Sequence, residues 1–248
     1  MSQQNTARTE LGLEFEYKWR VDDLVGDSDP TRLETADPLL VRWIDAAAAP
    51  IGAETARLYT LVQSGLHFDT ADGLLSRNGL NLRALINYGA LKGTGWMVLK
   101  ETVRWCAGRR EALEFGEMMP HDAFSQRLRS KACAPIARLH ERLLHEGQLE
   151  LAPFVKLVQR RRKMTLQLPT GFPLPISLDT VEFWPTGDAG EPRYHWWFEA
   201  EVNTSDARAI EALDVFAETI SRTLGREPDV RTKPDILAES LRPAAAAR

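Results

Sequence analysis

Three charged side chains near the N-terminus, Glu14, Glu16 and Lys18, stand at alternate positions. The residues that separate and flank them are apolar or aromatic: Leu13, Phe15, Tyr17 and Trp19. Because successive side chains of a β-strand point to opposite faces, residues 13–19 are predicted to form a strand with one charged face and one core face. Carboxylates two residues apart on a strand lie about 7 Å apart. That arrangement suits Mg²⁺ or Mn²⁺, and the lysine suits a phosphate oxygen. A solvated strand face with one ion pair is the alternative.

A second stretch with the same pattern lies near the other end of the chain. Within the predicted strand 193–202, Glu199 and Glu201 share one face, while Phe198, Ala200 and Val202 share the other. Two antiparallel strands that each carry paired carboxylates on one face can together assemble a divalent-metal site. This repetition favours the metal interpretation over the solvated strand.

Composition limits the function classes. The chain has 248 residues, 44% of them hydrophobic, and a net charge of −4, which argues against a generic nucleic-acid binder. The polar start of the chain does not resemble a signal peptide, and no apolar run is long enough to cross a membrane. The two cysteines, Cys106 and Cys133, form neither a disulfide framework nor a zinc pattern, so a cytoplasmic protein is expected. The P-loop motif is absent from the sequence.

The Glu-x-Glu-x-Lys motif at Glu14–Lys18 resembles the signature of the CYTH superfamily, or triphosphate tunnel metalloenzymes. This superfamily is named for class IV adenylate cyclases and thiamine triphosphatases. Later segments resemble it in the same order: Phe68-Asp69-Thr70, Leu82-Arg83, Val98-Leu99-Lys100, Arg109 with Glu111, Leu178-Asp179, Glu199 with Glu201, and Thr232-Lys233. Each motif is short, and their order and spacing carry the specificity.

The resemblance implies roles for particular residues. The expected metal ligands are Glu14, Glu16, Asp179, Glu199 and Glu201. The expected catalytic residues are Lys100 and Glu111, the latter as a base, with a metal-bound water as the alternative base. The expected substrate-binding residues are Lys18, Arg83, Lys100, Arg109, Lys156, Arg160, Arg162 and Lys233. Mg²⁺ or Mn²⁺ is the expected cofactor.

Two strand registers remain open, and one position departs from the superfamily. Arg110 with Glu114 could replace Arg109 with Glu111 if a single bulge swaps the faces of that strand. Strand 153–168 is basic on both faces; Lys156, Arg160 and Arg162 are expected to face the site, rather than the set that contains Arg161 and Lys163. Leu85 stands where the superfamily has a second arginine, which removes one phosphate ligand or shifts its duty to another residue.

The predicted fold reconciles charged strand faces with a packed core. Unpaired charges in a dry core cost several kcal/mol each, so the charged faces must line a wet cavity or look outward. A closed barrel satisfies the first option, with helices covering its apolar outer face. The resemblance implies such a fold, an α+β protein with an eight-stranded antiparallel barrel (a tunnel). Helices are expected at 31–49 and 206–224, and we expect one domain over 1–248 with a helical insertion at about 120–147.

The expected function is divalent-metal-dependent hydrolysis of inorganic triphosphate or an organic triphosphate inside this lumen. Two alternatives remain: a module that binds polyphosphate or a nucleotide without turnover, and a class IV adenylate cyclase. The expected partner is a small-molecule triphosphate, with neither nucleic acid nor membrane, and a homodimer is compatible with the sequence.

Overall fold

A computed structural model of the protein describes residues 8–55, 58–88, 94–120, 123, 126–127, 130, 132–143, 149–185 and 191–241. The strands are β1 Arg8–Arg20, β2 Glu54–Thr55, β3 Tyr59–Asp69, β4 Leu80–Asn87, β5 Thr94–Cys106, β6 Arg109–Pro120, β7 Ala152–Gln167, β8 Pro173–Pro185 and β9 Arg193–Val202. The helices are η1 Leu33–Ala36, α1 Asp37–Ala48, η2 Ala49–Ile51, α2 Leu74–Arg77, α4 Ala134–Arg142, α5 Ala207–Leu224 and α6 Lys233–Leu241.

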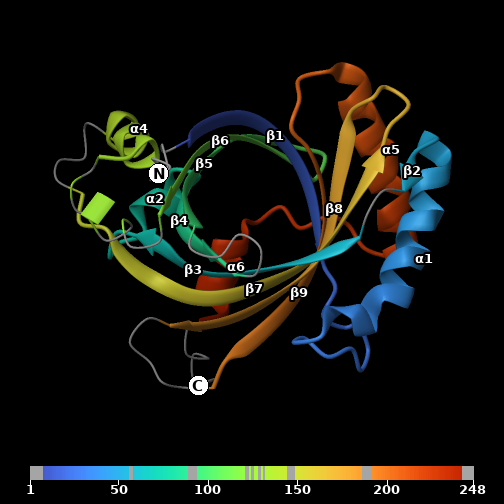
Figure 1. Ribbon diagram of the computed structural model, residues 1–248, viewed down its shortest axis with the longest axis horizontal. Coiled ribbons are helices and arrows are strands. Elements are labelled where there is room, and N and C mark those ends of the chain that lie inside the picture. Colours follow the sequence, from blue (N-terminus) through green and yellow to red (C-terminus); the bar gives the residue numbers. More distant parts are fainter. Residues whose placement is uncertain are drawn as a thin grey trace, which may run out of the picture.

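The strands form a closed antiparallel barrel (Figure 1). Eight strands follow one another in the order β7-β3-β4-β5-β6-β1-β9-β8, and the pairing of β8 with β7 closes the ring. The short β2 pairs with the end of β7 beside β3. Closure satisfies the hydrogen-bonding groups that an open sheet edge would leave unpaired. The fold class predicted from the sequence is therefore confirmed.

One helical layer, made of α1 and α5, covers the outer face of β1, β9 and β8 (Figure 1). The aromatic face of β1 packs into this layer, as its alternation predicts. The fully buried Trp19 contacts Phe198 of β9, and Phe198 contacts Trp43 of α1 and Phe216 of α5. Burying side chains of this size stabilises a fold by roughly 1.5–3 kcal/mol each. The layer therefore fixes β1 with its charged face toward the lumen.

A second layer covers the opposite side of the barrel (Figure 1). Ile136 and Leu139 of α4 pack with Leu82, Met97 and Leu99 on the outer faces of β4 and β5. Helix α4 belongs to the insertion predicted at about 120–147. The rest of that insertion lies partly outside the described residues.

Helix α5 agrees closely with its prediction. The Asp206 side chain accepts hydrogen bonds from the backbone N–H groups of Arg208 and Ala209, and Gly225 ends the helix with a φ of 68°. Both are common terminal signals of a helix. Helix 31–49 was also predicted, but the chain enters it through the 3₁₀ turn η1, and α1 begins at Asp37.

Helix α6 was not predicted, although its sequence carries an N-terminal signal. Thr232 and Asp235 each accept a hydrogen bond from the other's backbone N–H, and Pro234 lies in the first turn. This is a variant of the capping box, in which two side chains satisfy free N–H groups at a helix start. Ile236 and Leu237 pack against inward-facing apolar side chains of the barrel: Val155, Leu157, Val181, Phe183 and Trp197. Helix α6 thus covers one end of the lumen.

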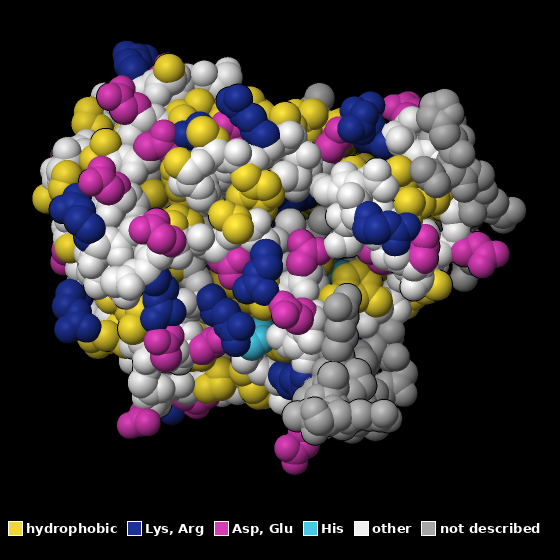
Figure 2. All heavy atoms as spheres, turned by 180° about the vertical axis from the view of Figure 1, so that it is seen from behind, with side chains coloured by type: hydrophobic (Ala, Val, Ile, Leu, Met, Phe, Trp, Pro, Cys, Tyr) yellow, Lys and Arg dark blue, Asp and Glu magenta, His cyan; other side chains and the backbone are white. Residues whose placement is uncertain are grey.

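The outer surface mixes charges of both signs. Figure 2 shows Lys and Arg side chains interleaved with Asp and Glu over the face seen from behind. Cys106 is exposed, Cys133 is buried, and neither is in a disulfide. Among the described helices, none combines the length and the apolar character that a membrane crossing would need.

Candidate active site in the barrel lumen

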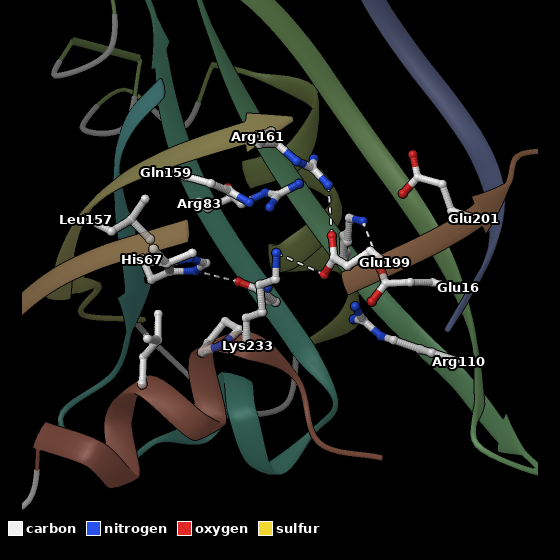
Figure 3. Close-up of a pocket in the computed structure, with 15 residues that line it drawn as sticks. Glu16, His67, Arg83, Arg110, Leu157, Gln159, Arg161, Glu199, Glu201 and Lys233 are labelled. Carbon is white, nitrogen blue, oxygen red and sulfur yellow. Dashed lines mark hydrogen bonds and ion pairs between the residues drawn. The ribbon is translucent and has the colours of Figure 1, made fainter. Parts of the chain in front are cut away.

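Charged side chains from nearly every barrel strand converge in the lumen (Figure 3). The nine predicted residues that lie there are Glu14, Glu16, Lys18, Arg83, Lys100, Asp179, Glu199, Glu201 and Lys233. Most of them are at least nine-tenths buried. Because buried charge is costly unless it is paired, the way these groups pair determines what the lumen can bind.

Three carboxylates form one cluster. A carboxylate oxygen from each of Glu14, Glu16 and Glu201 lies within 4.8 Å of the others. Glu16 and Glu201 are direct partners in the β1–β9 ladder. Burial, together with the negative charge of Glu16, Glu201 and Glu114, raises the pKa of Glu14 well above its ordinary value. Three hard oxygen donors at one point match the ligands that Mg²⁺ and Mn²⁺ prefer, so these residues fit a divalent metal.

Lys100 lies beside this carboxylate cluster. Its Nζ donates to Glu14 Oε1 at 2.7 Å and lies 3.0 Å from Glu114 and 3.7 Å from Glu16. Burial opposes protonation of this lysine, but Glu114, Glu14 and Glu16 outweigh burial and raise its pKa above the ordinary value. Lys100 is therefore a permanently charged group next to the cluster.

A separate network joins two cations to the remaining two acids. The Arg161 guanidinium donates to Glu199 at 2.8 Å, as Figure 3 shows, and to Asp179 at 3.0 Å. Lys233 Nζ lies 2.7 Å from Asp179 and 2.9 Å from Glu199. Burial opposes ionisation of Asp179, but Arg161 and Lys233 outweigh it and lower its pKa. Asp179 and Glu199, which were predicted as metal ligands, thus hold Arg161 and Lys233 in place.

Several buried donors in the lumen have no hydrogen-bond partner among the described residues. They are Nζ of Lys18, Nε of Arg83 and Nη2 of Arg110. Lys18 Nζ lies 3.9 Å from Glu16 and over the Trp105 ring at 4.9 Å, and burial lowers its pKa. A buried donor without a partner costs free energy, and an anion would supply the missing acceptors. The unpaired donors indicate a ligand with anionic oxygens.

The predicted register of β7 is wrong. Arg160 bonds Glu182 at 3.0 Å, Arg162 bonds Asp37 of α1 at 2.6 Å, and Lys156 lies over the Trp184 ring at 5.6 Å. All three point out of the barrel, whereas Gln159, Arg161 and Lys163 line the lumen. Because both faces of β7 are basic, its sequence alone carries no signal of direction. The ladder with β8 decides it, since Arg161 is the direct partner of the inward Asp179.

The predicted register of β6 is wrong as well, and the alternative holds. Arg109 bonds Asp214 of α5 at 2.6 Å and Glu111 at 3.0 Å, and Glu111 also accepts from Arg104 at 2.6 Å. Arg109 and Glu111 therefore lie on the outer face and cannot reach a ligand in the lumen. Arg110 and Glu114 lie inside instead. The β5–β6 ladder shifts register between Thr102 and Arg104, and the sequence carries no signal that predicts this irregularity.

The sequence interpretation missed several residues that line the lumen: His67, Asn81, Arg110, Glu114, Gln159, Arg161 and Lys163. His67 and Asn81 are hydrogen-bonded to each other at 2.9 Å. Because successive side chains of a strand point to opposite faces, most of these residues could have been identified once one inward-facing residue on each strand was known.

The lumen has two connected parts. The deep chamber has a volume of about 40 Å³ and reaches Pro234 and Leu237 of α6. The mouth, at the other end, has a volume of about 680 Å³. Both parts are lined by Arg83, Lys100, Arg161 and Glu201, so one ligand can contact both.

No family profile and no curated protein sequence matches this chain. Solved structures do. HpAC1 from Hippeastrum, described as having a dominant triphosphatase activity, aligns with a TM-score of 0.53 at 18% identity, over 93% of this chain and 98% of that one. The bh2851 protein from Bacillus halodurans, which is named after adenylate cyclase, aligns with a TM-score of 0.55 at 15% identity, over 91% and 97%.

This chain has the CYTH tunnel fold. At these identities the likeness concerns the fold, and the chemistry of the tunnel has to be argued from its own residues. In this tunnel fold β1 and β9 contribute the carboxylate cluster, and the donors without partners among the described residues come from Lys18 of β1, Arg83 of β4 and Arg110 of β6.

Proposed function

We propose that this protein hydrolyses the terminal phosphate of a triphosphate compound with the help of a divalent metal ion. The observation that carries the proposal is the contrast inside one lumen. Three carboxylates converge within 4.8 Å, and buried cationic donors without partners lie beside them. A metal ion would bind to the three carboxylates, and the oxygens of a polyphosphate would accept hydrogen bonds from the cationic donors.

Glu14, Glu16 and Glu201 would hold Mg²⁺ or Mn²⁺. Such an ion, when bound, supplies Lewis-acid polarisation of a phosphoryl group and a more acidic water. Asp179 and Glu199 are assigned a different role from the one the sequence suggested, because each is already bonded to Arg161 and Lys233. They position these two cations.

The basic side chains would bind and orient the phosphates. Lys18, Arg83 and Arg110 would donate to phosphate oxygens with the hydrogen atoms that now lack acceptors. Arg161 of β7 and Lys233 of α6 would neutralise further charge on the phosphates. Phosphoryl transfer needs mainly positioning and charge stabilisation, so a lumen of this kind can catalyse it with little covalent participation. Glu111 is not proposed as the base, because it lies outside the barrel.

The solved structures support this proposal by analogy. HpAC1 shares the fold and is described as having a dominant triphosphatase activity. Fold alone does not imply function, so the analogy adds to the argument from the site and does not replace it.

A phosphate-release assay tests the proposal. Inorganic triphosphate, ATP and thiamine triphosphate would each be incubated with the protein and Mg²⁺ or Mn²⁺. We expect metal-dependent release of orthophosphate and at least a 100-fold loss in Glu16→Gln, because the variant weakens the carboxylate cluster. Glu111→Gln is the matched control, a buried glutamate on the other face of the wall, and should stay within threefold of wild type.

Calorimetry with the same triphosphates separates catalysis from binding alone. Binding of a triphosphate without release of phosphate would overturn the hydrolase proposal in favour of a binding module. Equal activity of Glu16→Gln and wild type would defeat the metal assignment.

A further inference from the structure

The mouth of the lumen is unlike the deep chamber, because one arc of its wall is apolar. Leu61, Leu85, Trp96 and Val98 line it from three neighbouring strands, β3, β4 and β5. Across the lumen, β1 and β9 contribute Glu14 and Glu201, and Asn203 follows directly after β9. Strands β3, β4 and β5 also contribute Gln63, Arg83 and Lys100, so a ligand in the mouth meets an apolar patch and neighbouring cations on their side and carboxylates on the other.

Two glycines make room for this apolar wall. Leu85 and Trp96 are direct partners in the β4–β5 ladder. A Cβ on Gly65 would lie 2.7 Å from Leu85 Cδ2, and a Cβ on Gly116 would lie 3.4 Å from two ring atoms of Trp96. The Leu85 side chain thus lies over the bare backbone of β3, and the Trp96 ring lies against β6. Trp96 stays partly exposed to the mouth.

The sizes of the two parts determine which end of a substrate can lie where. The deep chamber, at about 40 Å³, has room for little beyond small groups, whereas the mouth, at about 680 Å³, admits a ring system. Trp96 lies four residues before Lys100 on β5, which is about 13 Å along the strand. Phosphates bound at Lys100 and deeper would leave any organic group of the substrate beside Trp96.

We propose that the Trp96–Leu85 wall binds the flat heterocycle of an organic triphosphate, so that the substrate is of the nucleoside triphosphate type rather than inorganic triphosphate. The inference rests on the proposed function of the same lumen. An inorganic chain is charged along its whole length and gains nothing from an apolar wall, whereas a heterocycle buries apolar area there and stacks on the indole. Position 85, where the resemblance predicts an arginine, carries a leucine. The part of the wall that the heterocycle would contact therefore has one cation fewer.

The test compares ATP with inorganic triphosphate in three variants. We expect wild type to have the higher kcat/KM for ATP, and Trp96→Ala to lower that value about 10- to 100-fold while activity on inorganic triphosphate stays within threefold. Trp96→Phe should restore most of the ATP activity. Trp184→Ala is the matched control, a partly exposed tryptophan on the outer face that contacts Lys156.

Three results would overturn the inference: inorganic triphosphate as the better substrate, an equal loss on both substrates in Trp96→Ala, or no loss on either. Calorimetry with a phosphonate analogue of ATP gives a readout that needs no turnover. If the protein hydrolyses nothing but Trp96→Ala weakens binding of the analogue tenfold or more, the proposed hydrolysis fails and the ring site stands.

Discussion

Both faces of the barrel wall carry buried or half-buried charges, but the two faces differ in how those charges are paired. On the outer face, Arg109 has Asp214 and Glu111, and Arg162 has Asp37. In the lumen, carboxylates crowd against carboxylates, and Lys18 Nζ is buried without a hydrogen-bond partner among the described residues. Arg109 Nε also lacks a hydrogen-bond partner there, but the guanidinium groups of Arg109 and Arg162 are each held by a carboxylate, whereas the Lys18 ammonium makes no hydrogen bond to any described residue. Crowded carboxylates beside a cation without a close carboxylate partner, rather than density of charge, therefore mark the site.

The largest expected effect contrasts Lys18 with Arg109. Lys18→Met should lower activity by about 10²–10³-fold, because it removes a donor aimed at the substrate. It should not lower the free energy of unfolding, because the ammonium is buried without a full partner. Arg109→Met should do the opposite, leaving activity within threefold but lowering the free energy of unfolding by about 1–3 kcal/mol. Phosphate release and urea denaturation measure the two quantities. If both variants changed activity and the free energy of unfolding in the same way, the proposed difference between the lumen and the outer face would be wrong.

A smaller effect contrasts adjacent residues of β7. Arg161→Ala should lower kcat/KM about 100-fold, since it removes a fixed cation from the lumen. Arg160→Ala, one position away on the outer face, should stay within threefold. Thermal melts of both variants check that they fold, and Arg161→Lys, which keeps the charge, should retain part of the activity. A larger loss in Arg160→Ala would show that the inward register of β7 is the one first predicted from the sequence.

The smallest expected effect concerns pH. Burial, with help from the charge of Arg83, lowers the pKa of His67 to about 3. The unfolded chain, whose histidine has a pKa near 6.5, then binds one proton more than the folded chain between about pH 6.5 and 3. The contribution of His67 to the free energy of unfolding should therefore fall by up to about 1.4 kcal/mol for each pH unit below about 6. In His67→Gln this slope should be shallower by that amount, as measured by urea denaturation from pH 7 to 4.5. Equal slopes would mean that His67 is solvated.

The parts of the fold that were predictable are those in which one face of a strand differs clearly from the other. In residues 13–19 of β1 and 198–202 of β9 the charged and apolar residues alternate strictly, so hydrophobic burial fixes the direction of the side chains there. Glu14, Glu16, Glu199 and Glu201 were placed in the lumen for this reason. The terminal signals at Asp206 and Gly225 likewise determined α5.

The misassigned parts are those in which both faces are charged. On β7 and β6 either register presents basic residues to the lumen, so the pattern of the strand cannot distinguish them. The choice depends on residues far away in the sequence, namely Asp179 for Arg161 and Asp214 for Arg109. Helix α6 was missed because its capping pair, Thr232 and Asp235, follows a loop with no periodic apolar pattern to extend.

Helix α6 also determines how ligands can enter and leave the barrel. Ile236 and Leu237 pack among the inward-facing side chains at the end of the lumen opposite the mouth. A polymer therefore cannot pass through the barrel from one end to the other. Substrates must enter, and products must leave, through the mouth of the lumen. Under the proposed function, a long polyphosphate could place only its terminus in the basic chamber, so hydrolysis would shorten such a chain from its end and would not cleave it internally.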